Sequence, residues 1–114
     1  MHEAGLVSVL IENLLELKDR QGAKRIIKFR VVMGELSGVD PEVFVMAYQT
    51  MSKTVEELKD ARMEMVKIPA RLRCEDCGRE FSGNYFSACP ECGSYMKTVL
   101  SGEELELREV ELEV

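Results

Sequence analysis

The chain has 114 residues, 46% of them hydrophobic, and lacks tryptophan. This length suits one compact domain or a small domain with an appendage, with a core built mainly from Leu, Val, Ile and Met. Its 21 acidic and 15 basic residues give a net charge of −6. An acidic balance disfavours nonspecific nucleic-acid binding, because that binding depends on Lys and Arg neutralising phosphates.

The hydropathy pattern argues against a membrane protein. No stretch approaches the roughly 18 consecutive apolar residues that a membrane span needs, and no basic segment precedes an apolar one as in a signal peptide. We therefore expect a cytoplasmic protein that does not act at a membrane. Thiols stay reduced in the cytoplasm, so the four cysteines indicate metal binding rather than disulfides.

The N-terminal half predicts a helix, a strand and a second helix. The first helix should span about residues 3–20, because its apolar residues recur at helical spacing: Val7, Leu10, Ile11, Leu14 and Leu17. A half-buried strand should follow, from the alternation of four apolar residues: Ile27, Phe29, Val31 and Met33. The second helix should run from about 41 to 58, with Asp40 as N-cap and Pro41 at its first position.

The C-terminal half predicts two strands that flank an irregular module. Residues 63–72 indicate a second strand whose alternation changes phase at Met65–Val66, where a bulge would explain the slip. Residues 72–98 are rich in Cys, Gly, Ser and Pro and show little apolar periodicity. The tail, residues 104–114, alternates again and predicts a last strand with a bulge or strong twist near Arg108–Glu109.

This element order predicts an α+β fold. The simplest arrangement is a small three-stranded sheet with two helices on one face, and a four-cysteine, zinc-ribbon-like module inserted before the last strand. An isolated terminal strand would not be stable, so the tail should join this sheet. We assign residues 1–70 with 100–114 to an α/β domain, and 71–99 to the cysteine domain.

The four cysteines have the spacing of a metal site. Cys74 and Cys77 form one pair with two residues between them, and Cys89 and Cys92 form a second pair eleven residues later. A glycine follows each pair, where a knuckle turn needs a residue free of Cβ clashes. Four thiolates suit tetrahedral Zn²⁺ and leave no open position for catalysis, so we expect a structural zinc.

Two other interpretations of the cysteines stay open at this point. They could be ordinary buried or redox cysteines, although the paired spacing disfavours this. The second motif, Cys-Pro-Glu-Cys-Gly, also resembles a rubredoxin knuckle and allows an iron site. A ferric tetrathiolate is red and a zinc site is colourless, so an absorption spectrum distinguishes the two metals.

The only histidine is His2, at the expected start of the first helix. An exposed helix start tolerates a histidine, so its position alone demands no function. However, the Met1 amine, the His2 amide nitrogen and the His2 imidazole can close two fused chelate rings, with Glu3 completing the set. Such nitrogen-rich ligands suit Ni²⁺ or Cu²⁺, and the affinity of the site for the metal should decrease as the pH is lowered. Asp40 presents a similar choice, because a carboxylate can cap a helix and bind a metal through different oxygens.

Four segments together resemble the HypA/HybF family of nickel metallochaperones. They are Met-His-Glu at the N-terminus, VVMGELSGVDPEVF in the middle, the two CxxC pairs with the second as CPECGS, and GEELELREVEL near the end. The resemblance covers the whole chain in order. No single segment is decisive, but the combination is highly specific.

The resemblance implies an α/β nickel-binding domain joined to a small zinc domain. It implies that His2 is the essential nickel ligand, that Glu3 and Asp40 contribute, and that the four cysteines hold a structural zinc. Ni²⁺ would be a transient cargo, delivered to the large subunit of [NiFe]-hydrogenase with a HypB-type GTPase partner, and in some organisms used in urease maturation. Some family members carry further histidines near the zinc module, and this chain has none.

We therefore expect a carrier and not an enzyme. The sequence offers no Ser/His/Asp or Cys/His set, and no Gly-rich phosphate loop, so GTP hydrolysis belongs to a partner. The contrasting hypothesis is a zinc-ribbon module that binds nucleic acid or regulates, with an incidental His2. Its support is a local group of basic and aromatic residues: Arg71, Arg73, Arg79, Tyr85 and Phe86. Whether the protein is a monomer or a homodimer stays open.

Overall fold

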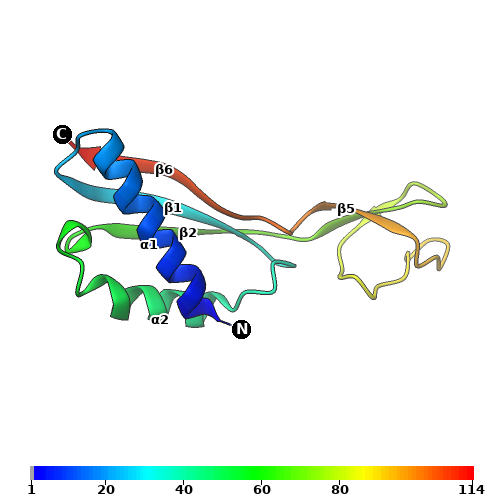
Figure 1. Ribbon diagram of the computed structural model, residues 1–114. Helices are drawn as coiled ribbons and strands as arrows, with labels where there is room; N and C mark the ends of the chain where they lie inside the picture. Colours follow the sequence, from blue (N-terminus) through cyan, green and yellow to red (C-terminus); the bar gives the residue numbers. More distant parts are fainter. Residues whose placement is uncertain (1) are drawn as a thin grey trace. The chain divides into compact units, whose positions relative to one another are not determined.

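The computed structural model describes residues 2–114 (Figure 1). Its elements are α1 (Glu3–Arg20), β1 (Arg25–Gly34), α2 (Pro41–Ser52), the 3₁₀ helix η1 (Glu56–Leu58), β2 (Arg62–Ile68), β3 (Arg71–Cys74), β4 (Glu80–Phe81), β5 (Lys97–Ser101) and β6 (Leu105–Glu113). The order of the large elements confirms the predicted succession, with the cysteine module ahead of the last strand.

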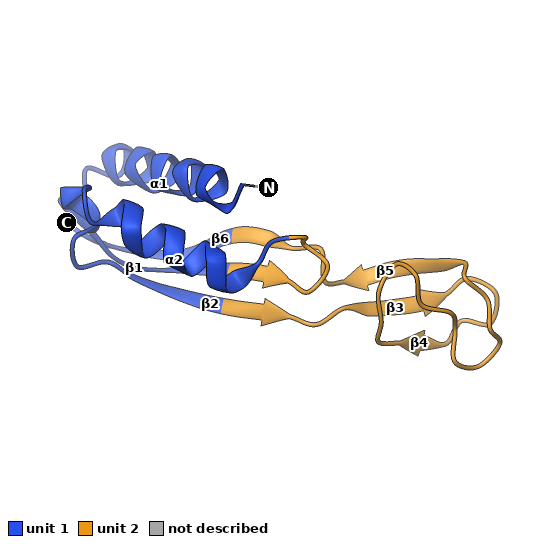
Figure 2. Cartoon of the chain, turned by 90° about the horizontal axis from the view of Figure 1, so that it is seen from below, with its two compact units in different colours: residues 1–31, 39–65, 107–114 blue, residues 32–38, 66–106 orange. Residues whose placement is uncertain are grey.

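The larger sheet has three strands in the order β2-β1-β6, and α1 and α2 lie together on one side of it (Figures 1 and 2). This confirms the predicted fold class. The first strand along the chain, β1, is central in this sheet, and its buried residues include the consecutive Val31, Val32 and Met33. Ile26 and Val32 are buried as well as Phe29, whereas the simple alternation placed Ile27 inside and Val32 outside. The Phe29 ring meets Tyr48 of α2 edge-on, with centroids 5.3 Å apart.

A second three-stranded sheet, in the order β4-β3-β5, lies within the cysteine module. The expected strand over 63–72 is in fact two strands, β2 and β3, which belong to different sheets. Pro69 lies between them and has no N–H to continue a ladder. The short strands β4 and β5 were not predicted, because β4 has only two residues and neither strand shows clear alternation.

The second helix is shorter than predicted. It ends at Ser52, and the Thr54 hydroxyl donates to the Met51 carbonyl at 3.0 Å where the helix stops. Val55 is extended, and the chain then forms η1, which places Leu58 in the core with 2% of its surface exposed. The apolar spacing that suggested a continuing helix therefore came from a separate turn that buries the same leucine.

The predicted irregularity in the last strand is present. Glu109 in β6 has a φ of 54°, in the left-handed region that residues other than glycine adopt rarely. It lies at the position where the alternation of the tail changes phase, so the phase change marks a real break in the regular strand.

Two backbone segments approach each other closely at the end of β1. A Cβ added to Gly34 would lie 2.0 Å from the Gly102 carbonyl oxygen. The Gly34 N–H donates to the Glu104 carbonyl at 2.7 Å, and the Leu36 N–H donates to the Gly102 carbonyl at 2.6 Å. These bonds hold the turn after β1 against the segment that precedes β6.

The chain divides into two compact units, coloured separately in Figure 2. The first contains residues 1–31, 39–65 and 107–114, and the second contains residues 32–38 and 66–106. The second unit thus includes the cysteines together with 32–38, 66–70 and 100–106, which the sequence assigned to the α/β domain. The domain assignment from the sequence stays a prediction. Among the described helices, none is long and apolar enough to cross a bilayer.

Tyr48 should be replaceable by Phe with a gain in stability. Its hydroxyl oxygen is buried and has no hydrogen-bond partner of normal geometry among residues 2–114. Burial raises the pKa of Tyr48 to about 12, although the Ser52 hydroxyl nearby partly opposes this. Removing an unpaired buried hydroxyl should raise the free energy of unfolding by about 1 kcal/mol, measured by urea denaturation of the Tyr48→Phe variant at pH 7.

The pH dependence supplies a second readout for Tyr48. The pKa of Tyr48 is higher in the folded protein than in the unfolded chain, so the unfolded chain ionises first as the pH rises. The free energy of unfolding is therefore unaffected by this group below pH 10 and decreases as the pH rises towards about 12. Tyr48→Phe should therefore lose less stability than wild type over that window. The exposed Tyr95 is the matched control, because Tyr95→Phe should change stability by less than about 0.5 kcal/mol. A lower urea midpoint for Tyr48→Phe would contradict the prediction.

The close approach at Gly34 predicts a large effect for Gly34→Ala. The added methyl would overlap the Gly102 backbone, which cannot move aside like a side chain. We expect a loss of more than about 2 kcal/mol of unfolding free energy. Gly22→Ala is a useful comparison, because nothing lies within 4 Å of its added Cβ and only its φ of 66° opposes the change. Equal effects of the two substitutions in thermal unfolding would contradict a steric role for Gly34.

Candidate metal centres

The four cysteine side chains converge on one point in the second unit. All four Sγ atoms lie within 4.8 Å of one another, with Cys74 and Cys92 at 3.5 Å and Cys77 and Cys89 at 3.6 Å. Zn–S bonds of about 2.3 Å in a tetrahedron place sulfurs about 3.8 Å apart. The thiols are free, so the number, chemistry and spacing of the donors fit a zinc ion.

The backbone builds this cluster from two equivalent turns. Gly78 donates its N–H to the Cys74 carbonyl at 3.0 Å, and Gly93 donates to the Cys89 carbonyl at 2.9 Å. The two glycines have φ values of 80° and 78°, which require a residue without a Cβ. The expected role of a glycine after each pair is therefore confirmed.

Amide N–H groups point at the first sulfur of each pair. The Cys77 N–H, whose nitrogen is 3.5 Å from the Cys74 sulfur, lowers the pKa of the Cys74 thiol. Burial acts to raise the pKa of Cys89, but the N–H groups of Cys92 and Glu91 outweigh it and lower this pKa to about 7. At the second sulfur of each pair a backbone N–H also acts to lower the pKa, but burial and hydrogen bonds with neighbouring sulfurs outweigh it, so the pKa of Cys77 is raised and that of Cys92 is raised to about 12. The thiolate, not the thiol, is the form that binds metal.

Two of the cysteines form half of a buried hydrophobic cluster in this unit. Cys74 and Cys89 pack with Leu72 and Phe81, and the partly buried Leu36 and Val99 pack against these four residues. We call Leu72, Cys74, Phe81 and Cys89 the sulfur core. Because this cluster has only two large apolar side chains, ordering of the segment around the cysteines should depend on the metal.

The helix starts of the first unit bring Glu3 and Asp40 together. The Asp40 N–H donates to the Glu3 carboxylate at 3.1 Å. This bond, followed by the N–H of Glu3 itself, lowers the pKa of the Glu3 carboxyl. Glu3 is therefore held as a carboxylate beside Asp40, as a metal ligand must be.

Asp40 is the N-cap of α2, as the sequence predicted. Its Oδ1 accepts hydrogen bonds from Glu42 N at 3.0 Å and Val43 N at 3.3 Å. Both cap bonds use the same oxygen, which leaves Oδ2 for another ligand. The structure thus permits capping and metal binding by one carboxylate.

His2 occupies the N-cap position of α1, where its carbonyl accepts the Leu6 N–H at 3.1 Å. Its imidazole makes no capping hydrogen bond, and the residue is exposed. No capping hydrogen bond therefore occupies the imidazole. The predicted contribution of Met1 lies outside the described residues.

The two predicted sites differ in how fully the protein assembles them. Within residues 2–114, the four cysteines are the one group of three or more His, Cys, Asp or Glu side chains whose ligand atoms lie within 4.8 Å of one another. The structure joins Glu3 to Asp40 but does not draw His2 into an equally tight group with them.

Two of the three arginines that suggested nucleic-acid binding make contacts within the protein. Arg71 donates to the Ser82 hydroxyl at 2.9 Å, and Arg79 pairs with Glu91 at 3.0 Å. These contacts weaken the case for a phosphate-binding face.

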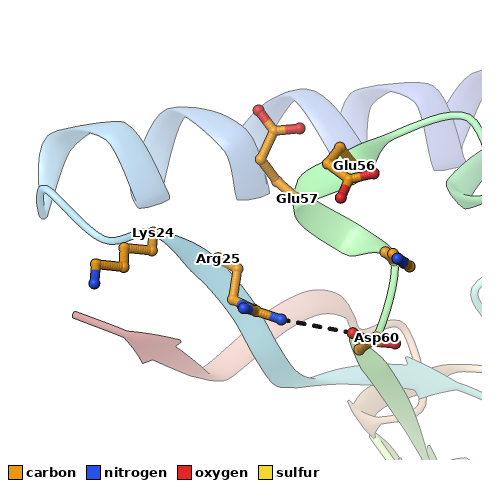
Figure 3. A pocket seen from close by; sticks show the side chains of 6 residues that line it. Lys24, Arg25, Glu56, Glu57 and Asp60 are labelled. Atoms are coloured by element: carbon orange, nitrogen blue, oxygen red, sulfur yellow. Dashed lines mark ion pairs between the residues drawn. The ribbon is translucent and has the colours of Figure 1, made fainter.

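A separate hollow of about 300 Å³ lies in the first unit (Figure 3). It is lined by three basic and three acidic residues: Lys24, Arg25, Glu56, Glu57, Lys59 and Asp60. Arg25 and Asp60 form an ion pair at 3.6 Å across it. Because the charges of the lining balance and no lining residue is His or Cys, the hollow does not resemble either metal site.

Comparison with known proteins identifies the family. A family profile described as "Hydrogenase/urease nickel incorporation, metallochaperone, hypA" matches residues 1–112. The chain belongs to the HypA family. The HypA-family assignment agrees with the resemblance seen in the sequence.

Individual HypA relatives match over their full length. Hydrogenase maturation factor HypA of Geobacter metallireducens is 33% identical, over 99% of this chain and 100% of its own. That of Aquifex aeolicus is 35% identical, over 100% and 99%. A solution structure of the Ni metallochaperone HypA from Helicobacter pylori matches with a TM-score of 0.69 and 31% identity, over 99% of this chain and 98% of the other.

Sequence reasoning missed the short segment that precedes Asp40. Leu36 packs against the sulfur core, and the Glu35 carboxylate accepts the Ala70 N–H at 3.0 Å. Both residues belong to the unit that contains the cysteines. The only signal in the sequence was one leucine in a polar turn, which does not by itself identify a packing partner.

Zinc content is the direct test of the cysteine site. The wild-type chain should bind about one zinc in native mass spectrometry, and Cys89→Ser should lose it, because serine is a poor ligand for Zn²⁺ and the buried sulfur also belongs to the core. Zinc affinity should decrease as the pH is lowered, since protons compete for the thiolates.

The exposed Met96 lies in the same unit and gives a matched control. Met96→Leu should keep its zinc. A Cys89→Ser variant with undiminished zinc would contradict the four-cysteine site. A red chromophore in the purified protein would instead support the iron interpretation.

Proposed function

We propose that this protein binds Ni²⁺ near its N-terminus and delivers it during [NiFe]-hydrogenase maturation. His2 is the essential ligand of this hypothesis, Glu3 and Asp40 contribute oxygens, and Met1 contributes its amine. The observation that carries the proposal is the hydrogen bond from the Asp40 N–H to the Glu3 carboxylate. It brings the start of α2 to the residue next to His2 in a member of a nickel-incorporation family.

The open character of this site suits a cargo that must leave. His2 is exposed and Glu3 is only partly buried, so an acceptor protein can approach the ion and replace ligands one at a time. Nitrogen and oxygen ligands of this kind suit Ni²⁺. We propose transfer by ligand exchange, with the nickel as substrate of the carrier and no bond made or broken in an organic molecule.

The cysteine site has the opposite character and a structural role in the proposal. A zinc held by four thiolates has no open position for a substrate. What zinc supplies when bound is the ordering of a unit whose apolar core is small. The protein is accordingly proposed to be a carrier and not an enzyme.

The proposed partners follow from this division of tasks. A HypB-type GTPase would supply nucleotide hydrolysis, the hydrogenase large subunit would receive the nickel, and urease maturation proteins are a second class of recipient. The cytoplasm is the proposed compartment, since four free thiols are typical of it. Neither a nucleic acid nor a membrane is part of the proposal, and either a monomer or a homodimer would serve it.

A nickel titration of the zinc-loaded protein with an untagged N-terminus tests the proposal. The wild-type chain should bind about one Ni²⁺, and His2→Ala should lose it while retaining zinc. Isothermal calorimetry and metal analysis measure the two quantities together. Equal nickel binding by both proteins, or none by either, would refute the terminal site.

Asp40 needs a substitution that separates its two roles. Asp40→Asn keeps a good N-cap but removes the carboxylate, so stability should hold while nickel affinity falls by about tenfold or more. Asp40→Ala should lose affinity and also about 1 kcal/mol of unfolding free energy. If Asp40→Asn binds nickel like wild type, Asp40 is a cap alone.

A further inference from the structure

The turn that precedes Asp40 is fixed by the unit that contains the cysteines. The Glu35 N–H donates to the Ile68 carbonyl at 2.9 Å, and the Leu36 N–H donates to the Gly102 carbonyl at 2.6 Å. The Glu35 carboxylate accepts the Ala70 N–H at 3.0 Å. Three hydrogen bonds to two different segments leave residues 35 and 36 little freedom.

Leu36 adds a side-chain anchor to these backbone bonds. It packs against the sulfur core, in which Cys74 and Cys89 are two of the four buried residues. The position of Leu36 therefore depends on the same side chains that would bind zinc. No other side chain of the segment 35–39 is part of that contact group.

Asp40 follows Leu36 by only four residues. The position of the Asp40 backbone determines where two carboxylates lie. The Asp40 carboxylate caps α2, and the Asp40 N–H donates to the Glu3 carboxylate. A small displacement of this peptide would change the separation of both carboxylates from His2. Metal affinity is sensitive to groups that orient ligands without touching the ion.

We propose that Leu36 is a positioning residue for the nickel site: its contact with the sulfur core anchors the segment that presents Asp40. This inference rests on the proposed function for its nickel readout. It assigns the cysteine unit a role in presenting a nickel ligand, without any ligand shared between the two metals.

The chain supplies a matched control in Val99. Val99 is also partly buried and packs against the same sulfur core, but it lies in β5, far along the chain from Asp40. Leu36→Ala and Val99→Ala both remove methyl groups from one core, so a general loosening of that core would affect nickel similarly in both. An effect transmitted through the segment 36–40 appears only in Leu36→Ala.

Nickel titration of zinc-loaded variants is the first readout. Leu36→Ala should retain one zinc and lose about tenfold in nickel affinity, whereas Val99→Ala should remain within about twofold of wild type. Leu36→Met, which preserves volume and apolar character, should restore the affinity. Equal losses in Leu36→Ala and Val99→Ala, or no loss in Leu36→Ala, would overturn the proposal.

Amide hydrogen exchange gives a second readout that needs no nickel. The Asp40 amide should exchange faster in zinc-loaded Leu36→Ala than in wild type or Val99→Ala, because its bond to Glu3 opens more often. Unchanged exchange at Asp40 would overturn the anchoring role. If the wild-type chain binds no nickel but Asp40 exchange responds to Leu36→Ala, the proposed function fails and the anchor stands.

Discussion

The convergence of four cysteine sulfurs is the contact on which the second unit depends. The buried cluster around these sulfurs has four residues, of which only Leu72 and Phe81 are not cysteines. So little apolar surface cannot offset the conformational entropy of ordering a loop-rich segment. Metal–sulfur bonds are the natural source of the remaining stability, and the strands β3, β4 and β5 are arranged around the residues that would supply them.

The two proposed metal sites use opposite physical designs. Backbone amides are aimed at the cysteine sulfurs, and the turns that carry them are fixed by the left-handed glycines. At the other site, one carboxylate is held by an amide, and the His2 imidazole makes no capping hydrogen bond. A preformed, charge-stabilised site retains its ion, and a partly formed site gives it up with less reorganisation. Retention and release are the two tasks that a carrier with a structural metal must keep separate.

Much of this architecture was predictable because the deciding signals are local. The periodicity of α1, the capping of α2 by Asp40 and the glycine after each cysteine pair all depend on residues within one or two turns of each other. The predicted end of α2 was wrong because Val55 and Leu58 continue the helical spacing although they lie in a separate turn. Likewise β2 and β3 were merged because the hydropathy pattern does not register which sheet a strand joins.

Long-range packing accounts for what the sequence could not reveal. Leu36 contacts residues that lie dozens of positions away, and Gly34 needs to be glycine because of Gly102. The composition of the segment around Leu36 gives no indication of either partner. For the nickel site, the sequence supplied the candidate residues, and the structure added the Glu3–Asp40 hydrogen bond that connects two of them.

The alternation of burial within the cysteine pairs has a consequence for metal exchange. The first cysteine of each pair, Cys74 or Cys89, is buried, and the second, Cys77 or Cys92, is exposed. An ion held by all four would therefore have two buried and two exposed ligand residues. Chelators, competing thiols and oxidants would have to begin at Cys77 or Cys92, so the order in which the protein loses its sulfur ligands is set by its fold.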